Sequence, residues 1–312
     1  MHIHARALRY FDAIRRSGSI REAARRLHVA SSAVNRQLLQ LEEEIGSLLF
    51  DRMKTGLKLT AAGEVFSQHV ITVLQDERRM TVQLEALRGI RRGELKIMTV
   101  EGLNTDLLPT VLERMLTRYP MIRMTVRSAG SAQIAQDVIN GDADVAVGFS
   151  LARTEALRQC AFGRFALGAL VQAGHPLAAL PHVTFAKCAR YPLIMASQEL
   201  SIHAAMKPLI AHVKRPLTVL LETASIELAK NMAARGVGVA FQTRVGVERD
   251  VEEGRLAWVP LHAQGATAGE VHTELGVYVR AGRTLPPVLD AFIRVMAEAI
   301  EERVAAAVSA SP

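Results

Sequence analysis

The sequence predicts an α/β protein whose N-terminal part is helical and whose remaining residues alternate between strands and helices. Three observations support this class. Apolar residues recur at helical spacing in the first 45 residues, a proline-free stretch runs from Thr60 to Arg88, and β-like apolar runs alternate with helical stretches beyond residue 93. The chain has 312 residues, 49% of them hydrophobic and 22% charged, which is enough for about two domains with a core each.

Positive charge is concentrated in the first third of the chain. Residues 1–92 hold 16 Lys and Arg against 10 Asp and Glu, whereas residues 93–312 hold 22 against 21. An excess of this kind favours a polyanionic partner, because phosphates attract basic side chains. A basic surface that only aids solubility is the alternative that composition leaves open.

Cysteine usage and the apolar runs indicate the compartment. Cys160 and Cys188 are too few for a disulfide framework and have no metal-ligand partner nearby in the sequence, which suits thiols in a reducing compartment. The first 20 residues contain basic side chains in place of a signal core, and no apolar run approaches the length of about 18 residues that spans a bilayer. We therefore expect a soluble, cytoplasmic protein with no membrane partner.

Two short helices are predicted at the N-terminus. Apolar residues at helical spacing mark the first, and Ser17-Gly18 ends it. Ser19 and Glu22 match a capping box, in which each side chain would bond the other residue's amide at the start of the second helix. The residues expected to face the core are Ala7, Leu8, Phe11 and Ile14 in the first helix, and Ile20, Ala23, Ala24 and Leu27 in the second.

A third helix follows the break at His28-Val29-Ala30, and Ser31 or Ser32 is expected to cap it. Its buried face comprises Val34, Leu38, Leu41 and Ile45, and the residues facing away are Ser32, Asn35, Arg36 and Leu39. Small polar residues and an arginine near the start of an exposed face suit a helix that enters the major groove, since Arg pairs with guanine edges and Asn with adenine edges. The acidic run 42–44 lies at the far end, away from phosphate.

A β-hairpin is predicted next, from apolar runs at 48–52 and 57–60 around a turn that contains Gly56. Arg52, Lys54 and Lys58 lie on this hairpin and suit a wing that flanks DNA. Two short helices joined by a tight turn after a first helix predict a helix-turn-helix. A plain three-helix bundle with a basic surface is the alternative.

The run from Ser19 to Glu64, SIREAARRLHVASSAVNRQLLQLEEEIGSLLFDRMKTGLKLTAAGE, resembles the N-terminal winged helix-turn-helix of LysR-type transcriptional regulators. It contains the family's alanine pair, its Leu-x-Val turn, its Gln-Leu-Glu-Glu run, its Gly-x-x-Leu-Phe-x-Arg segment and its Leu-Thr-x-x-Gly ending. The resemblance implies a DNA-binding transcription regulator that is not an enzyme. The residues it implies at the DNA are Ser31, Ser32, Ala33, Asn35, Arg36 and Arg52. The chain departs from many members at Ser31, Ser32 and Asn35, and for Ser31 a plain capping role is the alternative.

The proline-free stretch predicts one long helix with an apolar seam at alternating steps of four and three residues. The seam positions are Phe66, Val70, Val73, Glu77, Met80, Leu84 and Leu87. A second copy of the helix would cover this seam, whereas packing against the chain's own body is the alternative. The resemblance favours a homodimer, since family linker helices pair between subunits, and it further implies homotetramers and contact with RNA polymerase. Gly89 to Gly93 is interpreted as a hinge.

The last 220 residues alternate strand-like and helix-like runs, which argues for parallel α/β sheets. The resemblance implies a two-lobe effector-binding domain similar to periplasmic solute-binding folds. One lobe is expected at about 93–165 and 267–312 and the other at about 166–266, with Arg164 to Ala178 as the crossover. The expected organisation is thus a winged helix-turn-helix at 1–60, a linker helix and hinge at 61–92, and the effector-binding domain at 93–312.

Ligands in such folds bind where strands end and helices begin, because free amides and the positive end of the helix dipole favour carboxylates there. Each serine among the candidates could equally be a simple cap, Glu101 could meet a ligand or solvent, and Phe241 could line the cleft or belong to the core. The effector-binding candidates are Thr99, Val100, Glu101, Gly102, the run 128–131 with Ser128 and Ser131, the run 201–203 with Ile202 and His203, Ser225 and Phe241.

Signatures of catalysis are missing from the sequence. Gly236-Val237-Gly238 follows a helical run and so predicts a helix end rather than a dinucleotide site, and the ten histidines show no ligand spacing. We expect no catalytic residues, no metal and no cofactor other than a small-molecule effector. The leading interpretation is a regulator that binds double-stranded DNA at an inverted repeat; a solute-binding protein and an enzyme on the same two-lobe fold are the alternatives.

Overall fold

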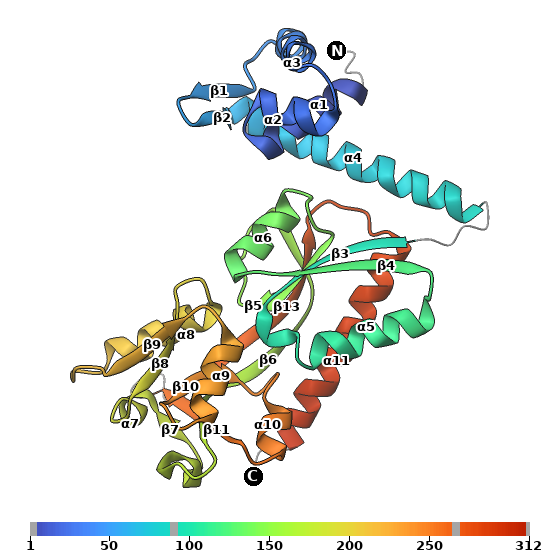
Figure 1. Cartoon of the computed structure of the whole chain (residues 1–312). Helices are drawn as coiled ribbons and strands as arrows, with labels where there is room; N and C mark the ends of the chain where they lie inside the picture. The colour runs from blue at the N-terminus through green and yellow to red at the C-terminus, as the bar shows by residue number, and fades with distance from the viewer. Residues whose placement is uncertain (1–4, 88–92, 264–268, 310–312) are drawn as a thin grey trace. The chain divides into compact units, whose positions relative to one another are not determined.

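The computed structural model describes residues 5–87, 93–263 and 269–309. Contacts within the chain separate two compact units, Met1–Ile90 and Arg91–Pro312, and each is described on its own (Figure 1). The interpretation of Gly89 to Gly93 as a hinge falls almost entirely outside the described residues.

Over its described residues, 5–87, the first unit consists of four helices and one hairpin. Its elements are α1 (Ala5–Ser17), α2 (Ile20–Leu27), α3 (Ser31–Ile45), β1 (Phe50–Met53), β2 (Gly56–Leu59) and α4 (Ala61–Leu87). The apolar stripes predicted for the first three helices meet in one core, in which Phe11, Ile14 and Val34 are almost fully buried. The hairpin is antiparallel and pairs Phe50 with Leu59. The sequence therefore predicted the order and type of these elements correctly.

Two capping predictions need correction. Ser19 does cap α2 by accepting from the Glu22 amide, but the Glu22 carboxylate turns to Arg25 and Arg26, so only half of the capping box is formed. Neither Ser31 nor Ser32 caps α3: the N-cap is Ala30, which offers no side-chain acceptor. The helix begins one or two residues earlier than expected, and both serines lie in its first turn.

Close backbone contacts fix the hairpin to the helices. The Leu57 amide donates to the Gly18 carbonyl at the end of α1, at 2.7 Å. The Thr60 hydroxyl donates to the Leu48 carbonyl at 2.7 Å and accepts from the Gly63 amide at 3.0 Å, which starts α4. A Cβ at Gly63 would lie 2.1 Å from the Leu49 carbonyl oxygen, so only glycine fits there. The Leu-Thr-x-x-Gly ending thus joins wing and long helix.

The predicted seam of α4 divides into two halves. Phe66 and Val70 are buried in the core of the first unit, as the alternative of packing against the chain's own body predicts. Met80 and Leu84 remain exposed. Glu77 forms an ion pair with Arg9 of α1, a contact that periodicity did not predict.

The second unit contains two lobes with separate cores. The first lobe holds β3 (Gly93–Thr99), η1 (Glu101–Leu103), α5 (Leu107–Arg118), β4 (Ile122–Ser128), α6 (Ser131–Ile139), β5 (Val145–Phe149), β13 (His272–Arg280) and α11 (Pro287–Ser309). The second holds η2 (Pro176–Ala179), β7 (Val183–Thr184), α7 (Phe185–Cys188), β8 (Leu193–Ala196), α8 (Ser201–Ala211), β9 (Val219–Thr223), α9 (Ile226–Ala234), β10 (Ala240–Thr243), α10 (Glu248–Glu252), β11 (Leu256–Ala263) and β12 (Gly269–Glu270).

One long strand belongs to both lobes. β6 (Leu157–Gln172) pairs with β13 over its first part and with β10 and β11 over its last part, which makes it the crossover expected near Arg164 (Figure 1). β3 runs parallel to β4 and β5, and β8 runs parallel to β9, whereas all pairs made by β6 and β13 are antiparallel. The expected parallel pairing is confirmed for β3, β4 and β5 and for β8 and β9, whereas β6 and β13 add antiparallel strands that the sequence did not predict.

Across the described residues, none of the helices combines the length and the apolarity that a membrane-spanning segment needs. Gly236 follows Arg235, the C-cap of α9, and has the φ of +74° that a helix end of this kind requires. The Gly236-Val237-Gly238 run is accordingly the exit of that helix.

Candidate nucleic-acid interface and ligand cleft

The N-terminal half of α3 presents a polar face opposite its buried seam. Val34 and Leu38 are buried at 0% and 4% exposure, whereas Ser31, Ser32 and Arg36 are exposed. Asn35 and Ala33 are half-buried on the same half of the helix. Ser32 and Arg36 therefore lie opposite the buried seam, and the other three residues predicted for the recognition helix flank them on the same half of α3.

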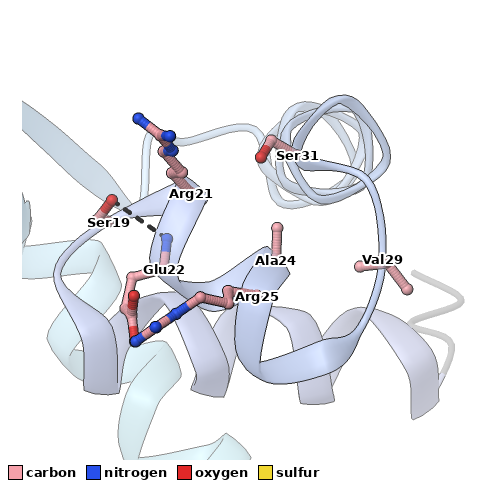
Figure 2. Close-up of a pocket in the computed structure, with 7 residues that line it drawn as sticks. All are labelled: Ser19, Arg21, Glu22, Ala24, Arg25, Val29 and Ser31. Atoms are coloured by element: carbon pink, nitrogen blue, oxygen red, sulfur yellow. Dashed lines mark hydrogen bonds and ion pairs between the residues drawn. The ribbon is translucent and has the colours of Figure 1, made fainter.

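The start of α3 is open to an anion. Its N-cap, Ala30, forms no side-chain hydrogen bond, so the first amides of the helix lack the side-chain acceptor that usually satisfies them. Figure 2 shows the hollow beside this end, with the Ser31 hydroxyl and the Arg21 guanidinium on opposite sides of it. The Glu22 carboxylate also lines this hollow, and the hydrogen bond from Arg25 lowers its pKa. Free amides at a helix start and nearby basic groups suit a phosphate.

The wing exposes all three of its predicted basic residues, but not on one face. Arg52 lies opposite Leu57 in the ladder, and Lys58 lies opposite Asp51. Because side chains alternate between the faces of a strand pair, Arg52 and Lys58 project to opposite faces. Lys54 is exposed in the turn between the strands. Lys54 and Arg52 are therefore the wing cations without an acidic residue directly across the ladder.

A cavity lies between the two lobes of the second unit. It is lined by Val100, Glu101, Gly102, Ser131, Phe149, Leu200, Ser201, Ile202, Ile226, Gln242, Thr243, Val245 and Thr273. The lining thus combines the end of β3 with the first turns of α6, α8 and α9, where backbone amides point outward. Five of the sequence-predicted candidates are brought together here: Val100, Glu101, Gly102, Ser131 and Ile202.

The other five candidates lie off this cavity, each for a local reason. Thr99 is fully buried, and its hydroxyl donates to the Val100 carbonyl. Ser128 accepts from the Asn104 amide, and the His203 ring bonds the Ala196 carbonyl. Ser225 caps α9 and lies beside the cavity rather than in its wall. Phe241 packs against Phe185, with ring centroids 5.5 Å apart, so of its two open roles the core role holds.

The sequence interpretation missed the polar wall formed by Gln242, Thr243 and Thr273. The sequence did contain a signal for Gln242. Residues alternate between the faces of a strand, so an apolar Phe241 in the core of the second lobe places Gln242 on the other side of β10. Thr273 could not be found in this way, because its place depends on the return of β13 from the second lobe to the first.

The lobes are closed in this structure. The cavity holds about 30 Å³, far below the roughly 300–1,000 Å³ of typical small-molecule sites. Arg303 of α11 reaches Asp106 of its own lobe and approaches Glu248 of the other lobe at 3.8 Å. Burial raises the pKa of the Glu248 carboxyl, which also accepts from the Gly246 amide at 2.7 Å. A ligand of ordinary size therefore requires the lobes to separate.

Comparison with known proteins agrees with this architecture. Residues 5–64 match the family model of the bacterial regulatory helix-turn-helix protein, lysR family, and residues 88–301 match that of the LysR substrate binding domain. Among curated relatives, the RuBisCO operon transcriptional regulator of Allochromatium vinosum is 26% identical over 292 residues, covering 94% of this chain and 95% of that protein.

Solved structures share the fold. A full-length OxyR variant from Pseudomonas aeruginosa has a TM-score of 0.71 and 19% identity, covering 96% of this chain and 95% of that one. Full-length CbnR in complex with its target DNA has a TM-score of 0.53 and 19% identity, covering 96% of this chain and all of that one.

The two family models together cover both units of the chain, from the recognition helix to the two-lobe cleft. The family consists of transcriptional regulators rather than enzymes, and its members combine a DNA-binding helix-turn-helix with an effector-binding domain. The chain belongs to the LysR family and is a DNA-binding transcriptional regulator with an effector-binding domain.

Proposed function

We propose that this regulator acts in the cytoplasm and reads an inverted-repeat operator as a homodimer, with α3 of each copy in successive major grooves. The observation that carries the proposal is the exposed face of α3, where Ser32 and Arg36 project away from the buried Val34 and Leu38. Ser32, Asn35 and Arg36 select the bases, since base edges and not phosphates carry sequence information.

Phosphate contacts set the affinity. The open start of α3, with Ser31 and Ala33 in its first turn, receives one backbone phosphate. Arg52 and Lys54 of the wing receive others, while Lys58 contributes less because Asp51 lies opposite it. The exposed Met80 and Leu84 supply the pairing surface that presents two recognition helices at once.

Regulation follows from the two-lobe cleft. A small effector enters between the first turns of α6, α8 and α9 and changes the closure of the lobes. Assembly of dimers into tetramers and contact with RNA polymerase belong to the same proposal and rest on family membership.

Fluorescence anisotropy with the DNA upstream of the chain's own gene tests the proposed function. A scrambled duplex of equal length is the matched control, and heparin serves as a polyanionic competitor. We expect the upstream duplex to bind at least about a hundredfold more tightly than the scrambled one at about 150 mM salt, in line with the ratio of roughly 10³ or more that specific DNA-binding proteins reach. Equal affinity for both duplexes would contradict the proposal.

A further inference from the structure

The cleft between the lobes contains a carboxylate that the chain itself supplies. Glu101 belongs to η1 in the first lobe, and its side chain crosses to the start of α9 in the second lobe. Its Oε1 accepts from the Ser225 hydroxyl at 2.9 Å, and its Oε2 accepts from the Ile226 amide at 2.6 Å. Both oxygens of one lobe's carboxylate are therefore bound by the other lobe.

Glu101 occupies the N-terminal end of α9, a position that suits a free anion. α9 is nine residues long, and the amide of Ile226, its first residue, has no partner within the helix. The Ser225 hydroxyl accepts from the Leu228 amide at 3.1 Å, so it donates its own proton to Glu101 while it caps the helix. Hydrogen bonds to an ionised acceptor are among the stronger ones, and the helix dipole adds to them.

Glu101 supplies the only charged side chain among the described residues of the cavity wall. The wall also contains the first turns of α6 and α8, whose N-caps, Gly130 and Leu200, make no side-chain hydrogen bond. Of the thirteen described residues that line it, Glu101 alone is ionisable, and the other polar members are neutral hydroxyl and amide groups. Gln242 is 3% exposed and donates to the Val245 carbonyl at 3.3 Å. A carboxylate ligand at the start of α9 would therefore face Glu101 without a cationic side chain to balance the two charges.

Backbone contacts hold the lobes close to this bridge. A Cβ at Gly246 of the second lobe would lie 2.5 Å from the carbonyl oxygen of Gly102, next to Glu101 in the chain. A Cβ at Gly130 would lie 2.8 Å from the carbonyl oxygen of Glu199. The lobes therefore meet at backbone distance at two places, and the Glu101 bridge lies within a closed arrangement.

We propose that Glu101 is a tethered carboxylate that fills the anion-binding end of the cleft at the start of α9, latches the lobes together and closes that end of the cleft to carboxylate effectors. The regulatory meaning of the latch rests on the proposed function, but the latch itself does not. An effector that donates a hydrogen bond to Glu101 can draw it away from α9 and release the lobes. A carboxylate would have to displace Glu101 from the two donors that already bind it.

The hydrogen-exchange rate of the Ile226 amide in the full-length protein measures directly whether Glu101 is bound to α9. We compare the wild type with Glu101→Ala, with Glu101→Gln, which keeps one acceptor but no charge, and with Glu113→Ala, whose carboxylate is exposed on α5. Acetate is the anionic probe and acetamide its uncharged counterpart. The latch predicts at least about tenfold faster exchange in Glu101→Ala, a smaller increase in Glu101→Gln and no change in Glu113→Ala.

The probes then identify the class of group that the site accepts. In Glu101→Ala, acetate should slow the Ile226 exchange and raise the melting temperature, whereas acetamide should do neither. In the wild type, neither probe should change the exchange, because Glu101 already occupies the position.

Three results would overturn the proposal. Unchanged Ile226 exchange in Glu101→Ala would show that no latch exists. Acetate acting on the wild type as strongly as on the variant would show that Glu101 excludes nothing. Acetate without effect on Glu101→Ala would show that the start of α9 does not take carboxylates. Anisotropy with upstream DNA is measured on the same samples, so a failure to recognise DNA while the latch behaves as expected would count against the proposed function alone.

Discussion

The carboxylate of Glu42, near the end of the recognition helix, accepts a hydrogen bond from the backbone amide of Leu49 at 2.7 Å. It also accepts from the Phe50 amide at 3.3 Å, and the residue is 8% exposed. The acidic run at 42–44 therefore contains one structural member and two exposed ones. Glu42 therefore fixes the first strand of the wing relative to α3. This fixes the position of Arg52 on the wing relative to Arg36 on the helix.

Replacing Glu42 with Ala should leave two buried amides without their acceptor, which typically costs about 1–3 kcal/mol. We expect faster hydrogen exchange over residues 48–52 and a lower melting temperature for the first unit. Glu43→Ala, at an exposed neighbouring position, should change stability by less than about 0.5 kcal/mol. Equal effects of the two substitutions would argue against a structural role for Glu42.

Lys54 should contribute one phosphate contact and no base discrimination. Its exposed position in the wing turn predicts that Lys54→Ala lowers the slope of log affinity against log salt by about one. Anisotropy titrations between about 50 and 200 mM salt, the range in which such slopes are measured, check this. Lys207→Ala, exposed on α8 of the other unit, is the control, and an unaltered slope in Lys54→Ala would remove the lysine from the interface.

The exposed half of the α4 seam should carry the dimer. Met80 is 53% exposed and Leu84 is 48% exposed, so placing glutamate at both positions puts charge where two apolar surfaces are expected to meet. Light scattering should show a shift from dimer to monomer in Met80→Glu/Leu84→Glu. Val65→Glu, at a position of 75% exposure outside the seam, should remain dimeric. A double variant that stays dimeric would place the pairing surface elsewhere.

Periodicity predicted what depends on local pattern. Helical spacing placed Phe11, Val34 and Leu38 in one core, and the alternation of strands and helices beyond residue 93 gave the class of the second unit. The exact first residue of α3 could not be predicted in this way. Serine is often an N-cap, but here the extended residue Ala30 precedes the helix instead.

Contacts between distant segments could not be predicted. The bridge from Glu101 to Ser225 joins residues 124 positions apart in different lobes, and the ion pair of Arg9 with Glu77 joins residues 68 apart. Nothing in the local sequence of either partner specifies such a pairing, since it depends on how the lobes and helices fold back. For the same reason, only half of the effector candidates line the cavity.

Cys188 should make stability depend on pH above 9. Burial raises the pKa of its thiol from an ordinary value of 9.0 to about 12, so the unfolded chain releases this proton at lower pH than the folded chain does. The contribution of the protonated Cys188 thiol to the free energy of unfolding is fully present below pH 9. This free energy then falls as the pH rises from 9 to 12, by up to about 1.4 kcal/mol per pH unit.

Urea unfolding at about pH 8.5 and about pH 10.5, on either side of the ordinary thiol pKa, measures this slope. Cys188→Ala should show a smaller loss of stability between the two pH values than the wild type. Val183→Ala, in the same core but without a titratable group, should keep the wild-type loss. Identical losses in Cys188→Ala and the wild type would show that the thiol is not the titrating group.

The specificity of Arg36→Ala tests most directly whether the exposed face of α3 reads DNA sequence. Anisotropy is measured with the upstream duplex and with a scrambled duplex at the same salt concentration, and Arg123→Ala on β4 serves as the control. We expect Arg36→Ala to lose about 1–3 kcal/mol of binding to the upstream duplex, roughly 5- to 150-fold, and much less to the scrambled one. Unchanged affinity for the upstream duplex, or equal losses on both duplexes, would show that this face does not read sequence.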